Sequence, residues 1–147
     1  MYARILVGID GSYPSVLALD EAIRLAKALG SKLRILHVVD EGLVLSPNVP
    51  SANLGESEPA KLEEGRSILD SARARARKEG VEPETVLLEE MTHQPGRLLV
   101  DQAGEWPADL LVCGTHGRSG IQRLVLGSDA EYVARHATVP VLLVRAK

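Results

Sequence analysis

The chain has 147 residues, of which 45% are apolar and 25% charged, and its formal net charge is −3. This composition predicts one globular domain over residues 1–147, and it disfavours nucleic-acid binding, which needs concentrated basic or aromatic side chains. The single cysteine, Cys113, excludes an internal disulfide, and no apolar run approaches the length of a membrane span, so we expect a cytoplasmic location.

The first elements of the chain alternate between strand and helix patterns. The apolar run Arg4–Asp10 predicts a buried strand that ends in an Asp-Gly turn. Ser12 or Ser15 is placed to cap the following helix, and Gly30 ends it. Lys32–Asp40 is again mostly apolar and predicts a second strand.

The stretch Glu41–Pro59 has no hydrophobic period and contains three prolines, two glycines and two asparagines. It predicts a long loop, and loops of this length usually have a functional role. The remaining predicted elements are a helix from Leu62 to Gly80, a strand Val86–Met91, a helix that opens at Pro95, a strand Asp109–Thr115, a helix from about Ser128 with Ala130, Val133, Ala134 and Ala137 on one face, and a strand Val139–Arg145.

Strands that alternate with helices and are apolar throughout indicate a parallel sheet covered on both faces. We therefore predict a doubly wound, five-stranded α/β fold. Ligands of such sheets bind outside the carboxyl ends of the strands, where the winding order reverses. Asp10 and Gly114 lie at the ends of two of the predicted strands and mark the places where a site is expected.

The segment between Gly114 and Ser128 is rich in glycine and joins a strand end to a helix start. The first turn of a helix presents unpaired N–H groups and a positive dipole end, which suit an anion, and His116 or Arg118 could add charge. Neither the Walker phosphate loop nor the Rossmann glycine pattern is present. Ser128 and Glu131 also fit a capping box, so turn geometry without a ligand stays open as an alternative.

The spacing Gly114-x2-Gly117-x9-Gly127-Ser128 resembles the G-x2-G-x9-G-[ST] signature of the ATP-binding branch of the universal stress protein family. The stretches VGIDGS, LHVVD, LLVCGTHG and GSDAEYVARHATVPVLLV resemble that family in the same order, so the resemblance covers the whole chain. It implies strand order 3-2-1-4-5 and a homodimer.

The resemblance also implies a nucleotide site. Its ligand would be ATP, or else ADP or AMP, with Mg²⁺ or Mn²⁺. Asp10 would accept a hydrogen bond from a ribose hydroxyl, and its alternative role is a plain Asp-Gly turn. The other implied contacts are Ile9 and Val38 beside the adenine, Gly114, His116 and Gly117 around the ribose and phosphates, and Gly127 and Ser128 at the outer phosphates.

Two positions depart from the family pattern. Members that bind ATP commonly have a second Ser or Thr two residues after the signature serine, where this chain has Ala130, and Asp129 lies between. If the Asp129 carboxylate points to solvent its effect is small. If it points inward, it holds a divalent ion or weakens ATP binding through repulsion.

Three functions remain open. The leading one is an ATP-binding stress-response module, at most a weak or self-phosphorylating ATPase, because no general base is visible. An adenylyl transferase is disfavoured because the second histidine of an HxGH pair is absent after His116. A dimeric interaction protein that no longer uses nucleotide is favoured by Asp129 and Ala130.

The last strand is short, rich in β-branched residues and, in the implied order, at an edge of the sheet. An exposed apolar edge pairs readily with another strand. We expect a homodimer through Val141–Val144, with Glu41–Pro59 covering the nucleotide or contacting a protein partner that the sequence does not identify. Elsewhere, the basic run from Arg73 to Lys78 predicts a solvated face, and Cys113 an inert buried side chain.

Overall fold

The computed structural model describes residues 1–40, 58–90, 94–116 and 126–146. Five parallel strands form one sheet in the order β3-β2-β1-β4-β5, which confirms the predicted fold and order. The elements are β1 Arg4–Ile9, α1 Tyr13–Leu29, β2 Lys32–Asp40, α2 Glu58–Lys78, β3 Glu84–Glu90, α3 Pro95–Glu105, β4 Leu110–Gly114, α4 Ser128–His136 and β5 Val141–Val144.

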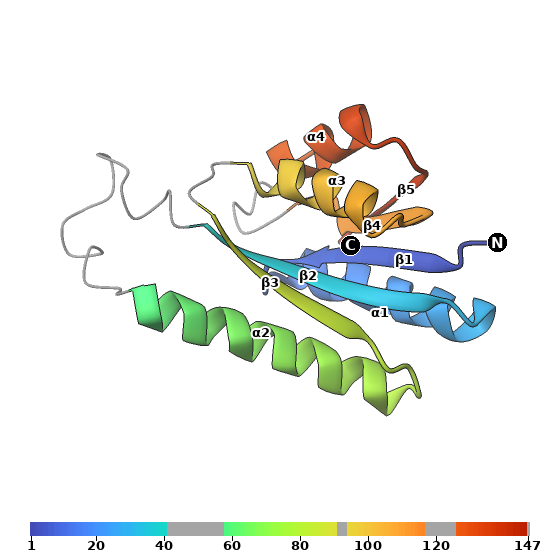
Figure 1. Cartoon of the computed structure of the whole chain (residues 1–147), viewed down its shortest axis with the longest axis horizontal. Helices are drawn as coiled ribbons and strands as arrows, with labels where there is room; N and C mark the ends of the chain where they lie inside the picture. Colours follow the sequence, from blue (N-terminus) through green and yellow to red (C-terminus); the bar gives the residue numbers. More distant parts are fainter. Residues whose placement is uncertain (41–57, 91–93, 117–125, 147) are drawn as a thin grey trace.

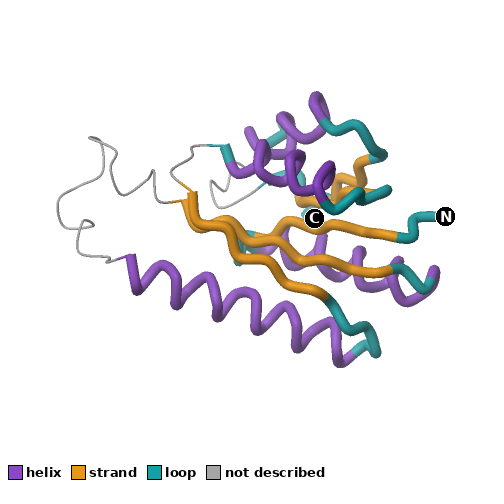
Figure 2. Tube along the Cα trace, viewed as in Figure 1, coloured by secondary structure: helices purple, strands orange, loops and turns teal. Residues whose placement is uncertain are grey.

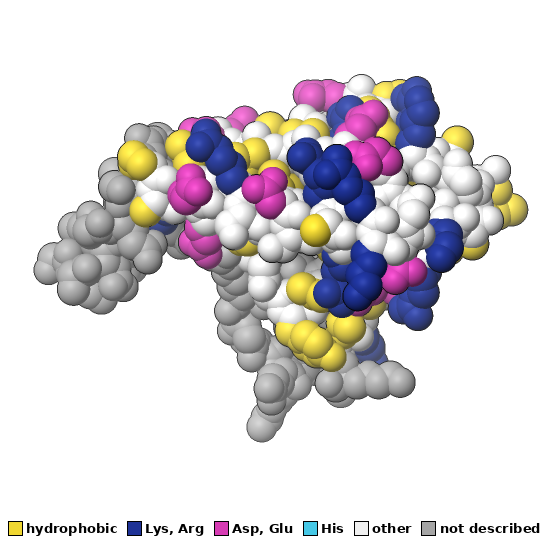
Figure 3. All heavy atoms as spheres, turned by 90° about the horizontal axis from the view of Figure 1, so that it is seen from below, with side chains coloured by type: hydrophobic (Ala, Val, Ile, Leu, Met, Phe, Trp, Pro, Cys, Tyr) yellow, Lys and Arg dark blue, Asp and Glu magenta, His cyan; other side chains and the backbone are white. Residues whose placement is uncertain are grey.

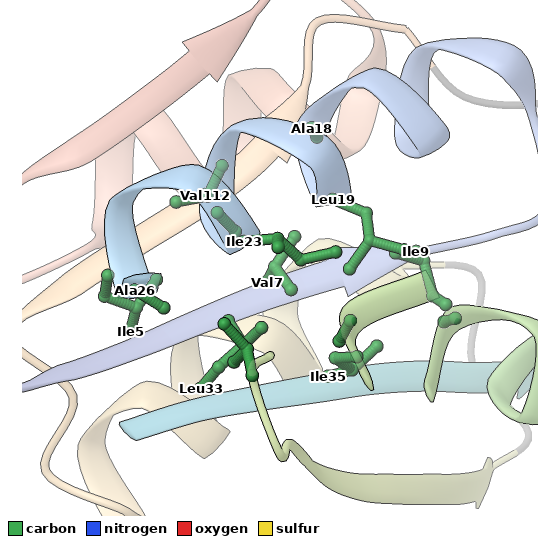
Figure 4. Packing of buried hydrophobic residues seen from close by; sticks show 14 of the residues in the cluster. Ile5, Val7, Ile9, Ala18, Leu19, Ile23, Ala26, Leu33, Ile35 and Val112 are labelled. Atoms are coloured by element: carbon green, nitrogen blue, oxygen red, sulfur yellow. The ribbon is translucent and has the colours of Figure 1, made fainter. Parts of the chain in front are cut away.

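Two helices cover each face of the sheet, α1 and α2 on one side and α3 and α4 on the other (Figures 1 and 2). Successive side chains of a strand point to opposite faces. On β1, Val7 therefore packs toward α1, where it meets Ile23 (Figure 4), while Leu6 joins the cluster under α3 and α4. Because both faces are covered, the inner strands are mostly apolar on both sides.

Helix α1 has the capping residues that the sequence predicts. Ser12 is the N-cap, and its side chain accepts a hydrogen bond from the Ser15 N–H. Pro14 lies in the first turn, where its missing N–H leaves no helical bond unmade. Gly30 ends the helix with φ of 68°, a left-handed conformation that glycine adopts without strain.

Several predicted boundaries differ from the structure. Helix α2 begins at Glu58, so Pro59 belongs to its first turn and the loop predicted to reach Pro59 ends earlier. The rest of that predicted loop, residues 41–57, lies outside the described residues. In α4, Ala134 is exposed, contrary to the predicted apolar face, while Val133 is fully buried.

The amino ends of the strands are tied together by polar contacts. The Asp109 carboxylate accepts hydrogen bonds from the backbone N–H groups of Ala3 and Arg4, at 2.9 and 3.0 Å. The Arg4 guanidinium donates to the carbonyl of Trp106 at 3.0 Å. The guanidinium of Arg34 lies 4.6 Å from the Trp106 ring, within the range of a cation–π contact. These contacts lie at the end of the sheet away from the carboxyl ends of the strands, where a ligand site is expected.

The surface on the side of α2 mixes both signs of charge (Figure 3). Arg75 pairs with Asp20 of α1 at 2.9 Å, and Arg77 pairs with Glu82 at 2.7 Å. Both arginines are exposed, as the predicted solvated face requires, whereas Arg73 is half-buried and donates to the Thr85 hydroxyl. None of the helices in the described part of the chain is long and apolar enough to span a bilayer.

Candidate functional site

The carboxyl ends of β1 and β4 lie at the point where the winding order of the sheet reverses. The register of these two strands runs from Ile5 opposite Leu110 to Val7 opposite Val112. Strand β1 continues to Ile9 and remains paired with β2, but its pairing with β4 stops at Val7. The ladder between β1 and β4 therefore ends before the strands do, and a ligand of such a sheet is expected there.

The turn after β1 is held by a closed set of hydrogen bonds. Asp10 Oδ1 accepts from the backbone N–H of Ser12 at 2.9 Å, and Gly11 has φ of 82°. The buried Ser15 hydroxyl donates to the Ser12 carbonyl at 2.9 Å and accepts from the Asp10 N–H at 3.3 Å. The Asp-Gly turn predicted as an alternative role for Asp10 is thus present. It includes the Ser15 hydroxyl, which the sequence predicted only as a possible helix cap.

The two predicted adenine contacts lie on opposite faces of the sheet. Ile9 belongs to the cluster under α1, and it lines a hollow of about 260 Å³ between α1 and α2. Val38 packs with the cluster on the other face. An adenine could touch both side chains only across the ends of the strands. The buried His37 sits opposite Ile9, and its Nδ1–H donates to the Ile9 carbonyl at 2.8 Å.

The glycine-rich segment is closed at its base by a backbone hydrogen bond. The N–H of Gly127 donates to the carbonyl of Thr115 at 2.7 Å, and the N–H of Thr115 donates to Val144 of β5 at 3.0 Å. These bonds bring Gly114 and His116 next to the start of α4. The Thr115 hydroxyl lies 3.1 Å from His116 Nδ1. The predicted contacts Gly117 and Arg118 lie outside the described residues.

Helix α4 starts without the predicted capping box. Gly127 is the N-cap, with φ of −60° and ψ of 157°, and as a glycine it has no side chain with which to cap the helix. The Glu131 N–H donates to the Gly127 carbonyl at 2.9 Å, so Ser128 is the first helical residue and cannot act as the N-cap. Ser128 is exposed and Ala130 is buried. The first amides of the helix have no intrahelical acceptor, as at any helix start.

Asp129 makes a contact that neither of the two orientations weighed from the sequence includes. Its Oδ1 accepts a hydrogen bond from the backbone N–H of Gly96, the second residue of α3, at 2.9 Å. The same carboxylate, together with burial as the larger cause, raises the pKa of the Cys113 thiol to about 12. Cys113 is 8% exposed and packs in the cluster under α3 and α4, in line with the inert role predicted for it.

Gly114 has a structural reason to be glycine. A Cβ at this position would lie 3.0 Å from the backbone carbon and oxygen of Pro14, in the first turn of α1. Few Cβ atoms in proteins come this close to backbone atoms. The close approach of α1 to the end of β4 therefore restricts position 114 even without a ligand.

The chain is similar to known proteins over nearly its whole length. The sequence model of the universal stress protein family matches residues 1–145. Universal stress protein YxiE of Bacillus subtilis is 36% identical over 151 aligned positions, which cover 99% of this chain and 100% of that protein. The structure of UspA from Lactobacillus plantarum is 26% identical, with a TM-score of 0.81 and 98% of each chain covered.

Two further solved structures contain adenine nucleotides. A universal stress protein in complex with cAMP is 33% identical to this chain, with a TM-score of 0.74 and 99% of each chain covered. A universal stress protein from Archaeoglobus fulgidus in complex with dAMP is 27% identical, with a TM-score of 0.71 and coverage of 97% of this chain and 98% of that one.

Proposed function

The chain belongs to the universal stress protein family, and we propose that it is an ATP-binding member whose shape or partner contacts depend on the bound nucleotide. The observation that carries the proposal is the bond between the Gly127 N–H and the Thr115 carbonyl. It brings the two described ends of the glycine-rich segment together, beside the strand ends where the winding order reverses.

The donors and acceptors at these strand ends suit an adenine nucleotide. The first turn of α4, whose N-cap is a glycine, offers backbone N–H groups and a positive dipole end, which favour phosphate oxygens. The Asp10 carboxylate is an acceptor of the kind that a ribose hydroxyl requires. Relatives that bind cAMP and dAMP support an adenine nucleotide as the ligand class.

Within this proposal, Gly127 and Ser128 contact the outer phosphates, while Gly114, His116, Gly117 and Arg118 surround the ribose and inner phosphates. Ile9 and Val38 border the adenine from the two faces of the sheet. Mg²⁺ or Mn²⁺ would be bound together with the nucleotide through its phosphates. The Asp129 carboxylate in the first turn of α4 accepts the Gly96 N–H at Oδ1.

The proposal extends to assembly and location. We propose a homodimer through Val141–Val144 and a cytoplasmic module that passes the nucleotide state to a protein partner. A slow ATPase remains compatible with such a site. The alternative function, a dimeric interaction protein that no longer uses nucleotide, was favoured by Asp129 and Ala130. The support from Asp129 is weaker, because one oxygen of its carboxylate accepts a hydrogen bond from α3.

The test is calorimetric titration of the purified chain with ATP, ADP and AMP in the presence of Mg²⁺, alongside mass spectrometry of copurified nucleotide. We expect saturable binding of ATP. Gly127→Val keeps the N–H that donates to the Thr115 carbonyl, and valine can adopt the observed φ and ψ of Gly127. Its side chain adds bulk at the turn before α4, which is the proposed phosphate turn. It should weaken ATP about tenfold or more, since overpacking costs about 1–3 kcal/mol.

The matched control is Ala134→Val, which adds bulk to the exposed side of the same helix. It should bind ATP as the original chain does. Absence of heat with all three nucleotides, and of copurified nucleotide, would contradict the proposed function. Equal weakening by both variants would show that Gly127→Val acts through the stability of α4.

A further inference from the structure

We infer that Asp129 is a positioning residue for the nucleotide site, joining the first turn of α4 to the first turn of α3 and thereby fixing the amides that face the phosphates. The inference rests on the proposed function. It adds α3 to the site, although no residue of α3 is among the predicted nucleotide contacts.

The side-chain contact replaces a missing cap. Gln94, the N-cap residue of α3, makes no side-chain capping bond to the helix. The N–H of Gly96, one of the amides that a helix start leaves without an internal acceptor, donates instead to Asp129 Oδ1 at 2.9 Å. Asp129 thus does for α3 what a capping residue does, but from another helix 33 positions away.

The backbones of α3 and α4 also approach each other closely, at Gly96 and Asp129. A Cβ at Gly96 would lie 2.7 Å from the backbone oxygen of Asp129 and 3.0 Å from its Cα. Since real Cβ atoms essentially never come within 3.0 Å of such atoms, only glycine admits α4 at this distance. The two helix starts are therefore held by a backbone approach on one side and a carboxylate bond on the other.

The charge of Asp129 suits this junction. Each helix start carries a partial positive charge, and an acidic side chain near it is stabilising. Asp129 lies in the first turn of α4 and bonds the first turn of α3, so one carboxylate offsets both positive ends. Loss of the carboxylate would remove the bond and leave two like dipole ends adjacent, which favours separation of the helices.

This arrangement predicts which part of the nucleotide is affected. A shift of the α4 start moves amides that would bind phosphates, whereas the turn after β1 that would hold the ribose is bonded within itself through Ser12 and Ser15. Variants of the junction should therefore weaken ATP and leave adenosine binding unchanged. A merely structural defect would weaken both.

The experiment compares Asp129→Ala, Asp129→Asn and Gly96→Ala in the full chain, by calorimetry with ATP and with adenosine, with and without Mg²⁺. Asp129→Ala and Gly96→Ala should weaken ATP roughly fivefold, the ratio that corresponds to one lost helix cap of about 1 kcal/mol. Their affinity for adenosine should stay within about twofold. Asp129→Asn keeps an oxygen acceptor for the Gly96 N–H but loses the charge, so its ATP affinity should lie between those of the original chain and Asp129→Ala.

Gly104→Ala is the matched control, because it lies on the same helix and a Cβ there meets no atom within 4 Å. It should leave both affinities unchanged. Unaltered ATP binding by Asp129→Ala would overturn the inference. Much tighter ATP binding by Asp129→Asn would also overturn it, because that result would show that the Asp129 carboxylate faces a phosphate and repels it. Loss of ATP binding by Asp129→Asn only with Mg²⁺ would assign Asp129 to the metal. If the original chain binds no adenine nucleotide, the proposed function itself is wrong.

Discussion

At the scale of single residues, Asp10 combines two roles that a substitution can separate. Its Oδ1 receives the Ser12 N–H within the turn, and its carboxylate is the proposed ribose acceptor. Asp10→Ala should lower the free energy of unfolding by about 1 kcal/mol, the contribution of one hydrogen bond, while Asp10→Asn keeps an acceptor for the turn. Urea denaturation without nucleotide measures the difference. An equal loss in both variants would mean that the charge, and not the hydrogen bond, stabilises the turn.

Cys113 gives a second prediction at this scale. Burial and the Asp129 charge raise the pKa of its thiol to about 12, so the native chain should not react with iodoacetamide at pH 8. The unfolded chain should react fully, which mass spectrometry detects. Above the ordinary thiol pKa of 9.0, the unfolded state loses this proton and the folded state retains it. The free energy of unfolding should therefore fall as the pH rises from 9.0 toward about 12.

Gly114 shows that a signature residue can be fixed by packing. Gly114→Ala would place a Cβ 3.0 Å from the Pro14 backbone, and overpacking of this kind destabilises proteins by about 1–3 kcal/mol. Thermal unfolding without nucleotide should show the loss, with Gly104→Ala as the control. A variant of unchanged stability would show that α1 can move away from β4. Weaker nucleotide binding by a Gly114 variant would not by itself demonstrate a phosphate contact.

At the scale of elements, the sequence predicts what local chemistry decides. The apolar runs gave all five strands, and Ser12 and Gly30 gave the limits of α1. The start of α4 near Ser128 was predicted correctly, but the capping box was not found. Ser128 and Glu131 fit that motif locally, whereas Gly127 takes the N-cap position and its own N–H is bound to Thr115. The bond from Gly96 to Asp129 was also missed, since it joins residues of two helices that only the folded sheet brings together.

The candidate site, like the helices and strands, was predicted from the sequence only in part. Asp10 and Gly114 were placed correctly at the ends of β1 and β4, because the apolar runs end there, while the strand order came from the family resemblance. Ile9 and Val38 point to opposite faces of the sheet. When both faces of a strand are buried, the pattern of apolar residues does not show which side chains point to which face. Thr115 has no sequence signal beyond its place after the strand.

At the scale of the whole molecule, β5 determines how copies could assemble. Among the described strands it pairs only with β4. The carbonyls of Pro140 and Val144 accept from β4, so residues 140, 142 and 144 face that strand and the N–H groups of Val141 and Leu143 face outward. Two copies related by a two-fold axis can pair these edges antiparallel.

Leu143→Pro removes an outward N–H and leaves the bonds to β4 in place. It should convert the proposed dimer to a monomer in light scattering at micromolar concentration. Leu143→Ala keeps the N–H and should remain dimeric. A monomeric original chain, or a dimer that tolerates the proline, would place the contact elsewhere or rule it out.

The position of Trp106, the only tryptophan, has an optical consequence. Gly96, in the first turn of α3, lies beside the proposed phosphate turn. The C-cap of the helix is Trp106, whose indole is 9% exposed and lies against Arg34 at the opposite end of the sheet. The helix separates the two by about 15 Å at 1.5 Å per residue. Tryptophan emission therefore reports the integrity of the domain from outside the site. Ligand titrations that leave this emission constant while calorimetry registers heat would separate occupancy from unfolding within one sample.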